Sequence, residues 1–285
     1  MWPLYYLIII TAPLLILFLN SIRLHWMNPI PAPNYLMYYF FLGNFDIIQT
    51  KQWMFPFLHL WSICVEEHFY IVWPFILAFF SIKNLKFIFA AVIGISLSTR
   101  LYYFIYCPDL ASLAIYLNTL SRIDIIVLGA IAAYIHFKTP IKLNVSKPIR
   151  ILLLLVIVAC FCVDYVYSFN SFFAVTIKEY LYCIASGFLM LNFLFNDNKL
   201  IHFKKKGLLH YIGKISFGVY IYHNIILGII MDNIVARYGG DKIGLCLFLI
   251  LYLGSTLLLS VISWELFEKQ ILKFKSRFEL IPTKR

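Results

Sequence analysis

The sequence predicts an all-α fold, a polytopic membrane helix bundle of about eight transmembrane helices plus a short re-entrant or interfacial segment. Composition is the first reason: 62% of the 285 residues are hydrophobic and 13% are charged, against roughly 45–50% apolar and about 25% charged in an average soluble domain. The second is the recurrence of apolar runs near the ~20 residues that a helix needs to cross a bilayer. The third is the confinement of basic residues to short connections.

Hydropathy places the individual spans along the chain. They lie near residues 2–20, 65–80, 87–104, 122–136, 151–168, 179–195, 215–235 and 243–267. A further apolar run, Tyr35 to Phe45, is too short for a helix that crosses ~30 Å of hydrocarbon, and its length is typical of a re-entrant or interfacial segment. Prolines at 29, 31 and 33 precede it, and their missing amide donors favour irregular backbone at the water interface.

The positive charges predict the topology. They fall on alternate connections, and cytoplasmic connections carry an excess of Lys and Arg. We therefore expect a multi-pass protein of the inner (plasma) membrane with both termini cytoplasmic and residues 46–64 outside; a spanning Tyr35–Phe45 run would instead put the N-terminus outside. The four clusters are Lys83 and Lys86; Lys138, Lys142, Lys147 and Arg150; Lys199, Lys204, Lys205, Lys206 and Lys214; and the tail from Lys269 to Arg285.

The same charges bear on partners. The formal net charge is +11, but its placement indicates membrane topology and a lipid bilayer as the surroundings, with no nucleic acid partner. The six cysteines show neither paired metal spacing nor a disulfide ladder. We expect no metal site and no bound cofactor.

The strongest local signal is the stretch from His59 to Tyr70, HLWSICVEEHFY. Adjacent carboxylates, Glu66 and Glu67, enter an apolar helix here, and ionisable groups at membrane depth are expensive unless they face a cavity or a partner. Ser62, Glu66 and Tyr70 are four residues apart and share one helix face. A carboxylate on that face could orient a histidine or take a proton from a substrate hydroxyl. The alternative is an interfacial cluster that merely ends a span.

Three other helices carry polar pairs. Arg122 and Asp124 start a span on different helix faces, which favours binding to other helices or to substrate over pairing with each other, while a structural ion-pair role stays open. Tyr220 and His223 are neighbours on one helix surface; an interhelical hydrogen bond is an equally good interpretation. Glu265 and Glu268 lie near a cytoplasmic helix end, where solvated charge is expected.

Several of these motifs, taken in order, resemble the acyltransferase-3 family of bacterial membrane O-acyltransferases. The segments that carry the resemblance are Trp2 to Tyr6, Phe41 to Phe45, His59 to Tyr70, Ser121 to Asp124 with Gly129 to Ala132, Ile215 to His223, and Trp264 to Lys269. The resemblance implies a single membrane acyltransferase-3-like domain over residues 1–285. It also implies an O-acyltransferase that transfers an acyl group, most naturally acetyl, from a cytoplasmic donor such as acetyl-CoA to hydroxyls of cell-envelope polysaccharide or other carbohydrate.

The resemblance also suggests roles for individual residues, with acyl-CoA as a donor substrate and not a bound cofactor. Glu66, Glu67 and His59 are the candidate catalytic residues. The candidate substrate-binding residues are Trp61, Ser62, Tyr70, Arg122, Asp124, Tyr220 and His223. We expect Trp61 and the two carboxylates to lie near Arg122 or His223 in a polar cavity, because isolated charge facing hydrocarbon is costly.

One departure from the family pattern concerns its first two helices. The family usually has ten spans, with a catalytic histidine and a basic cytoplasmic motif in or after the first two, and this chain begins where the third is expected. His25, His59 and His223 do not obviously replace that histidine. The chain alone is therefore expected to be weak or inactive, with a separate fragment as a partner that supplies the helices.

Two other hypotheses stay open. A transporter or flippase of lipid-linked sugars would also need intramembrane charge, but transporters commonly show repeated halves, and none is detected here. The other alternative is an inactive remnant of a split acyltransferase.

Overall fold

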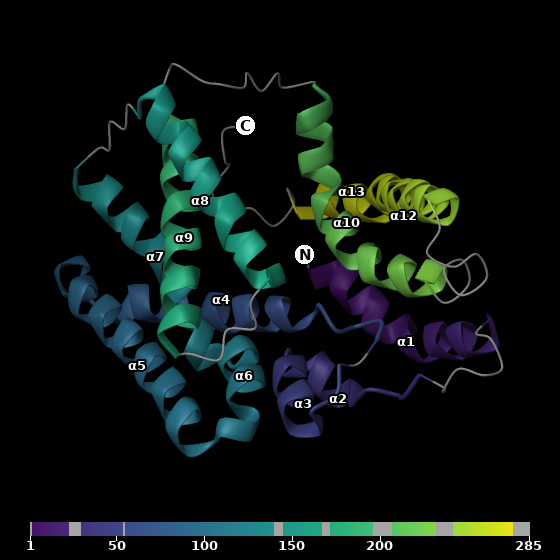
Figure 1. Ribbon diagram of the computed structural model, residues 1–285, viewed down its shortest axis with the longest axis horizontal. Helices are drawn as coiled ribbons and strands as arrows, with labels where there is room; N and C mark the ends of the chain where they lie inside the picture. The colour runs from purple at the N-terminus through teal and green to yellow at the C-terminus, as the bar shows by residue number, and fades with distance from the viewer. Residues whose placement is uncertain are drawn as a thin grey trace. The chain divides into compact units, whose positions relative to one another are not determined.

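A computed structural model describes residues 2–22, 30–53, 55–139, 145–166, 172–195, 207–231 and 242–275 (Figure 1). Within these ranges the chain forms helices and turns and contains no β-strand. It divides into two compact units, Met1–Trp61 with Phe203–Arg285, and Ser62–His202. Each unit is described by itself.

The first unit combines the two ends of the sequence. Its long helices are α1 (Trp2–Ile22), α10 (Leu208–Ile230) and α12 (Lys242–Ser263), and two short helices, α2 (Tyr35–Tyr39) and α3 (Gly43–Thr50), follow α1. The main packing is between α10 and α12, and α1 also contacts α10. Gly218 permits the close approach of α10 to α12, because a Cβ there would lie 3.3 Å from the Cα of Ser260.

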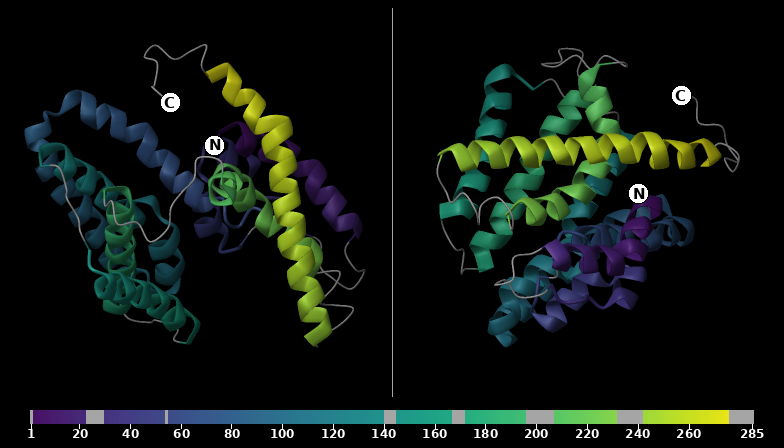
Figure 2. Two further views of the ribbon diagram at one scale, coloured as in Figure 1. Left: turned by 90° about the horizontal axis from the view of Figure 1, so that it is seen from above. Right: turned by 90° about the vertical axis from the view of Figure 1, so that its right-hand side faces the viewer.

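The last helix of this unit changes its winding near its end. A π-helical turn, Trp264–Glu268, joins α12 to α13 (Lys269–Lys275). Figure 2 shows the three pieces as one uninterrupted rod. A π turn holds one more residue than an α turn, so the side chains after it point in directions that an unbroken α-helix would not give them.

The short run near residue 40 folds as the sequence predicts, because neither α2 nor α3 is long enough to cross a bilayer. They are separated at Phe41, whose φ of 57° lies in the left-handed region. The pair docks on α1: the Tyr5 hydroxyl donates a hydrogen bond to the Tyr38 carbonyl at 2.7 Å, and the rings of Tyr5 and Phe41 stack with centroids 4.8 Å apart. Gly43 fits beneath the Tyr38 ring, which leaves no room for a Cβ.

The second unit is a continuous series of helices. Its members are α4 (Trp61–Phe79, whose first residue belongs to the first unit), the 3₁₀ turn Ile82–Asn84, α5 (Leu85–Tyr106), α6 (Pro108–Leu117), α7 (Thr119–Lys138), α8 (Lys147–Val166) and α9 (Phe172–Phe195). Its core lies between α4, α5 and α7 and includes Phe69, Leu85, Phe89 and Val127. Trp73 stacks between Phe69 and Phe89, at centroid distances of 4.9 and 5.8 Å.

The helices agree with the predicted membrane architecture. A helix lies at each of the positions that hydropathy selects. Six helical stretches of the described chain are long and apolar enough to cross a membrane: Trp2–Ser21, Trp61–Phe79, Ile82–Tyr106, Pro108–Lys138, Leu208–Ile230 and Gly244–Phe274. The chain is therefore an all-α polytopic membrane protein. His25, the lysines at 199 and 204–206, and the basic tail beyond 275 lie outside the described residues.

Candidate functional site

A non-helical segment, Phe55 to Leu60, lies along one face of α10 just before α4 begins. Leu60 is completely buried, and Phe57 and His59 are 1% and 7% exposed. Two contacts attach the segment to α10: the ring of Phe55 covers Gly228, and the Tyr220 hydroxyl donates a hydrogen bond to the His59 carbonyl. Tyr220 and Gly228 are eight residues apart and therefore lie on the same side of the helix.

This arrangement brings two histidines together that are far apart in the sequence. The rings of His59 and His223 meet edge to face, with centroids 4.8 Å apart and an interplanar angle of 67°. The Tyr220 ring completes the group, 5.1 Å from His59 and 5.6 Å from His223. We call these three residues the imidazole cluster.

The hydrogen bond of His223 determines which of its ring nitrogens is an acceptor. Its Nδ1 bonds to the Tyr220 carbonyl, and a carbonyl oxygen can only accept, so Nδ1 carries the hydrogen. In the neutral ring, Nε2 then holds the free lone pair. His223 is therefore arranged to take a proton through Nε2.

His59 has a different electrostatic character. Its burial, together with the neighbouring His223 imidazole, lowers the pKa of His59 from 6.5 to about 3. Desolvation penalises the charged ring, and a second ring that can also become positive adds to the penalty. His59 is thus uncharged near neutral pH.

The candidate carboxylates lie one helix turn or more beyond this cluster in the sequence, on α4. Glu67 is 3% exposed, Glu66 is partly buried and Tyr70 is exposed. Among the described residues, neither carboxylate forms an ion pair or a hydrogen bond with a cationic side chain. The adjacent His68 instead ties α4 to the start of α7, because its Nδ1 lies 2.7 Å from the Thr119 hydroxyl.

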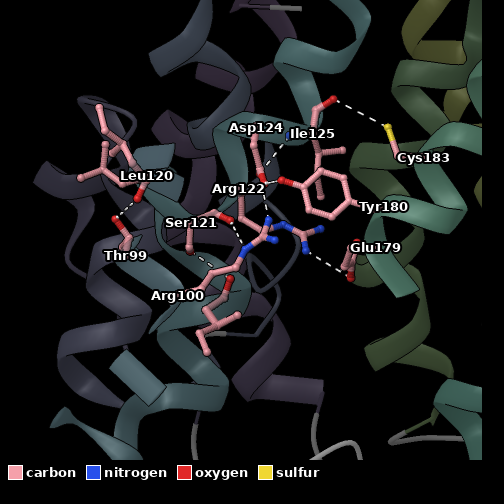
Figure 3. Close-up of polar contacts among 12 residues, drawn as sticks. Thr99, Arg100, Leu120, Ser121, Arg122, Asp124, Ile125, Glu179, Tyr180 and Cys183 are labelled. Atoms are coloured by element: carbon pink, nitrogen blue, oxygen red, sulfur yellow. Dashed lines mark hydrogen bonds and ion pairs between the residues drawn. The ribbon is translucent and has the colours of Figure 1, made fainter. Parts of the chain in front are cut away.

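Asp124 lies at the centre of a buried network in the second unit (Figure 3). Its Oδ1 accepts from Arg100 at 2.8 Å, and its Oδ2 accepts from the Tyr180 hydroxyl at 2.6 Å. Arg100 also donates through Nε to the Ser121 carbonyl, at 2.8 Å. These bonds connect α5, α7 and α9 within the bundle.

Arg122 points to a different partner, as the helical spacing of the Ser121–Asp124 motif predicts. It forms an ion pair with Glu179 of α9 at 3.2 Å, and both side chains are 18% exposed. Its guanidinium also lies 5.4 Å from the Tyr116 ring centre. The two opposite charges of the motif thus bind neighbouring helices and not each other.

The sequence pattern does not predict Arg100, Glu179 and Tyr180 as site residues. Arg100 does carry a recognisable signal: it is a lone arginine near the end of an apolar run, where an unpaired charge is costly and a partner is expected. The residues of α9 had no comparable signal, because their partners are more than 50 positions away. An even longer separation, more than 160 positions, hides the His59–His223 contact.

The two glutamates at the end of α12 differ in their surroundings. Glu265 pairs with Lys269, and both side chains are partly exposed, in agreement with a solvated helix end. Glu268 accepts a hydrogen bond from the Ser263 hydroxyl at 3.2 Å and borders Gly218 of α10. The π turn directs it toward α10.

The described residues contain no group of three or more His, Cys, Asp or Glu side chains arranged to hold a metal ion.

Comparison with known proteins identifies the family. The profile of the acyltransferase domain matches residues 4–265, nearly the whole chain. This chain belongs to the acyltransferase domain family. The matched region contains the 55–60 segment, the imidazole cluster, the carboxylates of α4 and the Asp124 network.

Curated relatives of this acyltransferase-family chain include named O-acetyltransferases. The peptidoglycan O-acetyltransferase OatA of Listeria monocytogenes is 27% identical over 187 residues, which cover 59% of this chain and 28% of that protein. The O-acetyltransferase OatA of Staphylococcus aureus is 27% identical over 244 residues, 81% of this chain and 38% of that protein. The chain thus spans about a third of the length of these relatives. No solved structure matches it.

Proposed function

We propose that this chain acts in O-acyl transfer at the inner (plasma) membrane, moving an acetyl group to a hydroxyl of a cell-envelope carbohydrate. A cytoplasmic thioester such as acetyl-CoA is the proposed donor. Membership of the acyltransferase family, the O-acetyltransferase names of the relatives and the apolar helices support this proposal.

The imidazole cluster is the observation that carries it, and it favours a general base at His223 in place of the substrate contact that the sequence predicts. The hydrogen bond from Nδ1 of His223 to the Tyr220 carbonyl leaves Nε2 as a base. In the proposed step, Nε2 takes the proton of the acceptor hydroxyl while the hydroxyl oxygen attacks the acyl carbonyl carbon of the donor. A new ester C–O bond forms, the thioester C–S bond breaks, and the proton passes from His223 to the departing thiolate.

The topology supports an acceptor on the outside. His223 lies beyond the middle of α10, toward the end that the charge pattern assigns to the extracytoplasmic face. The 55–60 segment falls within the residues 46–64 that the same pattern places outside. Acetyl transfer at this point would meet a glycan without moving the glycan across the bilayer, and the acyl group of the cytoplasmic donor would have to reach the same point through the membrane.

Supporting roles are proposed for the other candidates. Glu66 and Glu67 would orient substrate or assist the base, and Trp61, Ser62 and Tyr70 would border the sugar. Asp124 is completely buried with both oxygens bonded inside the protein, which favours a structural role. Arg122 is partly exposed and is the better candidate of the two for contact with substrate.

The test is a chromosomal His223→Gln substitution in the organism that encodes the chain, so that any partner protein remains present. Gln keeps hydrogen-bonding capacity but cannot act as a base at neutral pH. The rate at which alkali-labile acetate is added to the envelope glycan should fall by about 10²–10⁴-fold, the usual contribution of a general base.

His210→Gln is the matched control, because His210 lies exposed on the same helix. It should leave the acetate unchanged. Full acetylation in the His223→Gln strain would overturn the base assignment. A loss of lipid-linked sugar translocation, with acetylation by membrane preparations intact, would instead favour the transporter hypothesis.

A further inference from the structure

The contact between Phe55 and Gly228 is the tightest glycine contact in the described chain. Three atoms of the Phe55 ring, Cζ, Cε1 and Cε2, all lie within 2.7 Å of the position that a Cβ on Gly228 would occupy. No side chain other than hydrogen fits there while the ring stays in place. The aromatic ring therefore rests directly on the backbone of α10.

Glycine is otherwise an unfavourable choice at this position. It weakens a helix interior relative to alanine because it has more freedom to lose on folding. Gly213, on the same helix, has open space around its missing Cβ, so the two glycines differ in what their lack of a side chain provides. At position 228 the lack of a side chain leaves the space that the Phe55 ring occupies.

The Phe55–Gly228 contact affects the imidazole cluster because Phe55 and His59 belong to the same short segment, residues 55–60. The segment is attached to α10 at both ends, by Phe55 on Gly228 and by the His59 carbonyl bonded to Tyr220. Between these points Phe57 packs against Tyr38, with ring centroids 6.1 Å apart. A displacement at Phe55 would therefore be transmitted along four residues to His59.

We propose that Gly228 is a positioning residue for the proposed acyl transfer: its bare backbone seats the Phe55 ring and thereby sets His59 against His223. Gly228 touches no reacting atom in this account. The inference rests on the proposed function for its catalytic consequence, but its structural part can be tested independently of activity.

The structural test measures how readily diethyl pyrocarbonate modifies His59 in isolated membranes, by mass spectrometry of the His59 peptide. In the native chain the buried ring should react slowly, and exposed His210 serves as the internal reference. Gly228→Ala should raise the His59 rate about tenfold or more, because overpacking is relieved by local opening. Gly213→Ala should leave it unchanged.

A compensating substitution makes the test specific. Phe55→Leu lacks the three ring atoms that the added methyl group would strike. The double variant Phe55→Leu with Gly228→Ala should therefore return His59 toward native protection, and acetylation of the envelope glycan should recover with it. General damage to folding would not be repaired by this second substitution.

The pH profile of transfer gives a readout that a purely structural role would not change. In Gly228→Ala, exposure of His59 should return its pKa toward 6.5, so transfer should show an added dependence on pH between about 5 and 7 that the double variant lacks. An unchanged His59 rate in Gly228→Ala would overturn the positioning role. Exposed His59 with unchanged transfer would instead count against the proposed function of the cluster.

Discussion

Arg100 and Asp124 form an ion pair at 2.8 Å with side chains that are 2% and 0% exposed. Such a pair is expensive to break from one side, because the remaining charge stays buried without a counter-charge. The pair also connects α5 to α7, and through Tyr180 to α9. It therefore bears on the stability of the second unit.

Replacing Arg100 with Leu should destabilise the protein by about 3–5 kcal/mol, the usual cost of leaving one partner of a buried pair. Thermal unfolding in detergent micelles measures this. The double replacement of Arg100 and Asp124 by Leu should recover much of the loss, because neither charge remains. Arg122→Leu is the matched control and should cost less, since that pair is partly exposed. Equal losses for the two arginines would contradict the buried-pair account.

Stability should depend on pH through His59. Its pKa is lowered to about 3 in the fold and returns to about 6.5 on unfolding, so the unfolded chain binds the extra proton. The free energy of unfolding is therefore unaffected by His59 above about pH 6.5 and decreases as pH falls toward 3. The decrease is about 2 kcal/mol between pH 7 and 5.

The measurement is the midpoint of thermal unfolding at pH 7 and pH 5, compared between the native chain and His59→Asn. The native chain should lose more stability on acidification than the variant. His210→Gln, which changes an exposed ring, should keep the native pH dependence. Parallel shifts in all three proteins would show that His59 is not the group responsible.

Two glycines of α10 should respond in opposite directions to alanine. Gly218→Ala should cost about 1 kcal/mol, within the range for mild overpacking, because its Cβ would meet the backbone of Ser260 at 3.3 Å. Gly213→Ala should be neutral or stabilising by up to about 1 kcal/mol, since the site is open and alanine favours helix. Thermal unfolding in one detergent compares them. A stabilising Gly218→Ala would show that α12 moves aside easily.

The predicted topology remains to be tested by labelling. Cysteines introduced at Lys51 and Lys204, in a background without the native cysteines, should react differently with a membrane-impermeant maleimide on intact cells. The Lys51 site should be labelled directly, and the Lys204 site only after permeabilisation, because the positive-inside rule assigns them to opposite sides. Labelling of both on intact cells would reject the eight-span arrangement.

The local pattern of the sequence predicts much of the fold. The apolar runs locate the long helices because a bilayer demands a minimum length of apolar residues, and the brevity of the Tyr35–Phe45 run correctly indicates that it does not form a spanning helix. The faces of α7 also follow from spacing alone. These features depend on residues within a few turns of one another.

The candidate site depends on contacts that no local pattern contains. His59 contacts His223, which is more than 160 positions away in the sequence. Arg100 lies near Tyr180 only because α5, α7 and α9 pack together. The sequence identified His59 and Asp124 as chemically interesting, but their partners follow from tertiary packing. The catalytic roles of Glu66 and Glu67 remain predictions.

The π turn at Trp264–Glu268 has a consequence for sequence change in this region. An extra residue in one helical turn works as a local phase shift between α12 and α13. Deleting one residue there would let the turn return to α-helical winding, and the remaining residues would cover roughly the same rotation about the axis as the π turn does now. The Lys269 to Lys275 stretch would then keep its neighbours, so the chain should tolerate the loss of one residue in this turn better than a one-residue deletion inside α12, which would rotate every following side chain by about 100°.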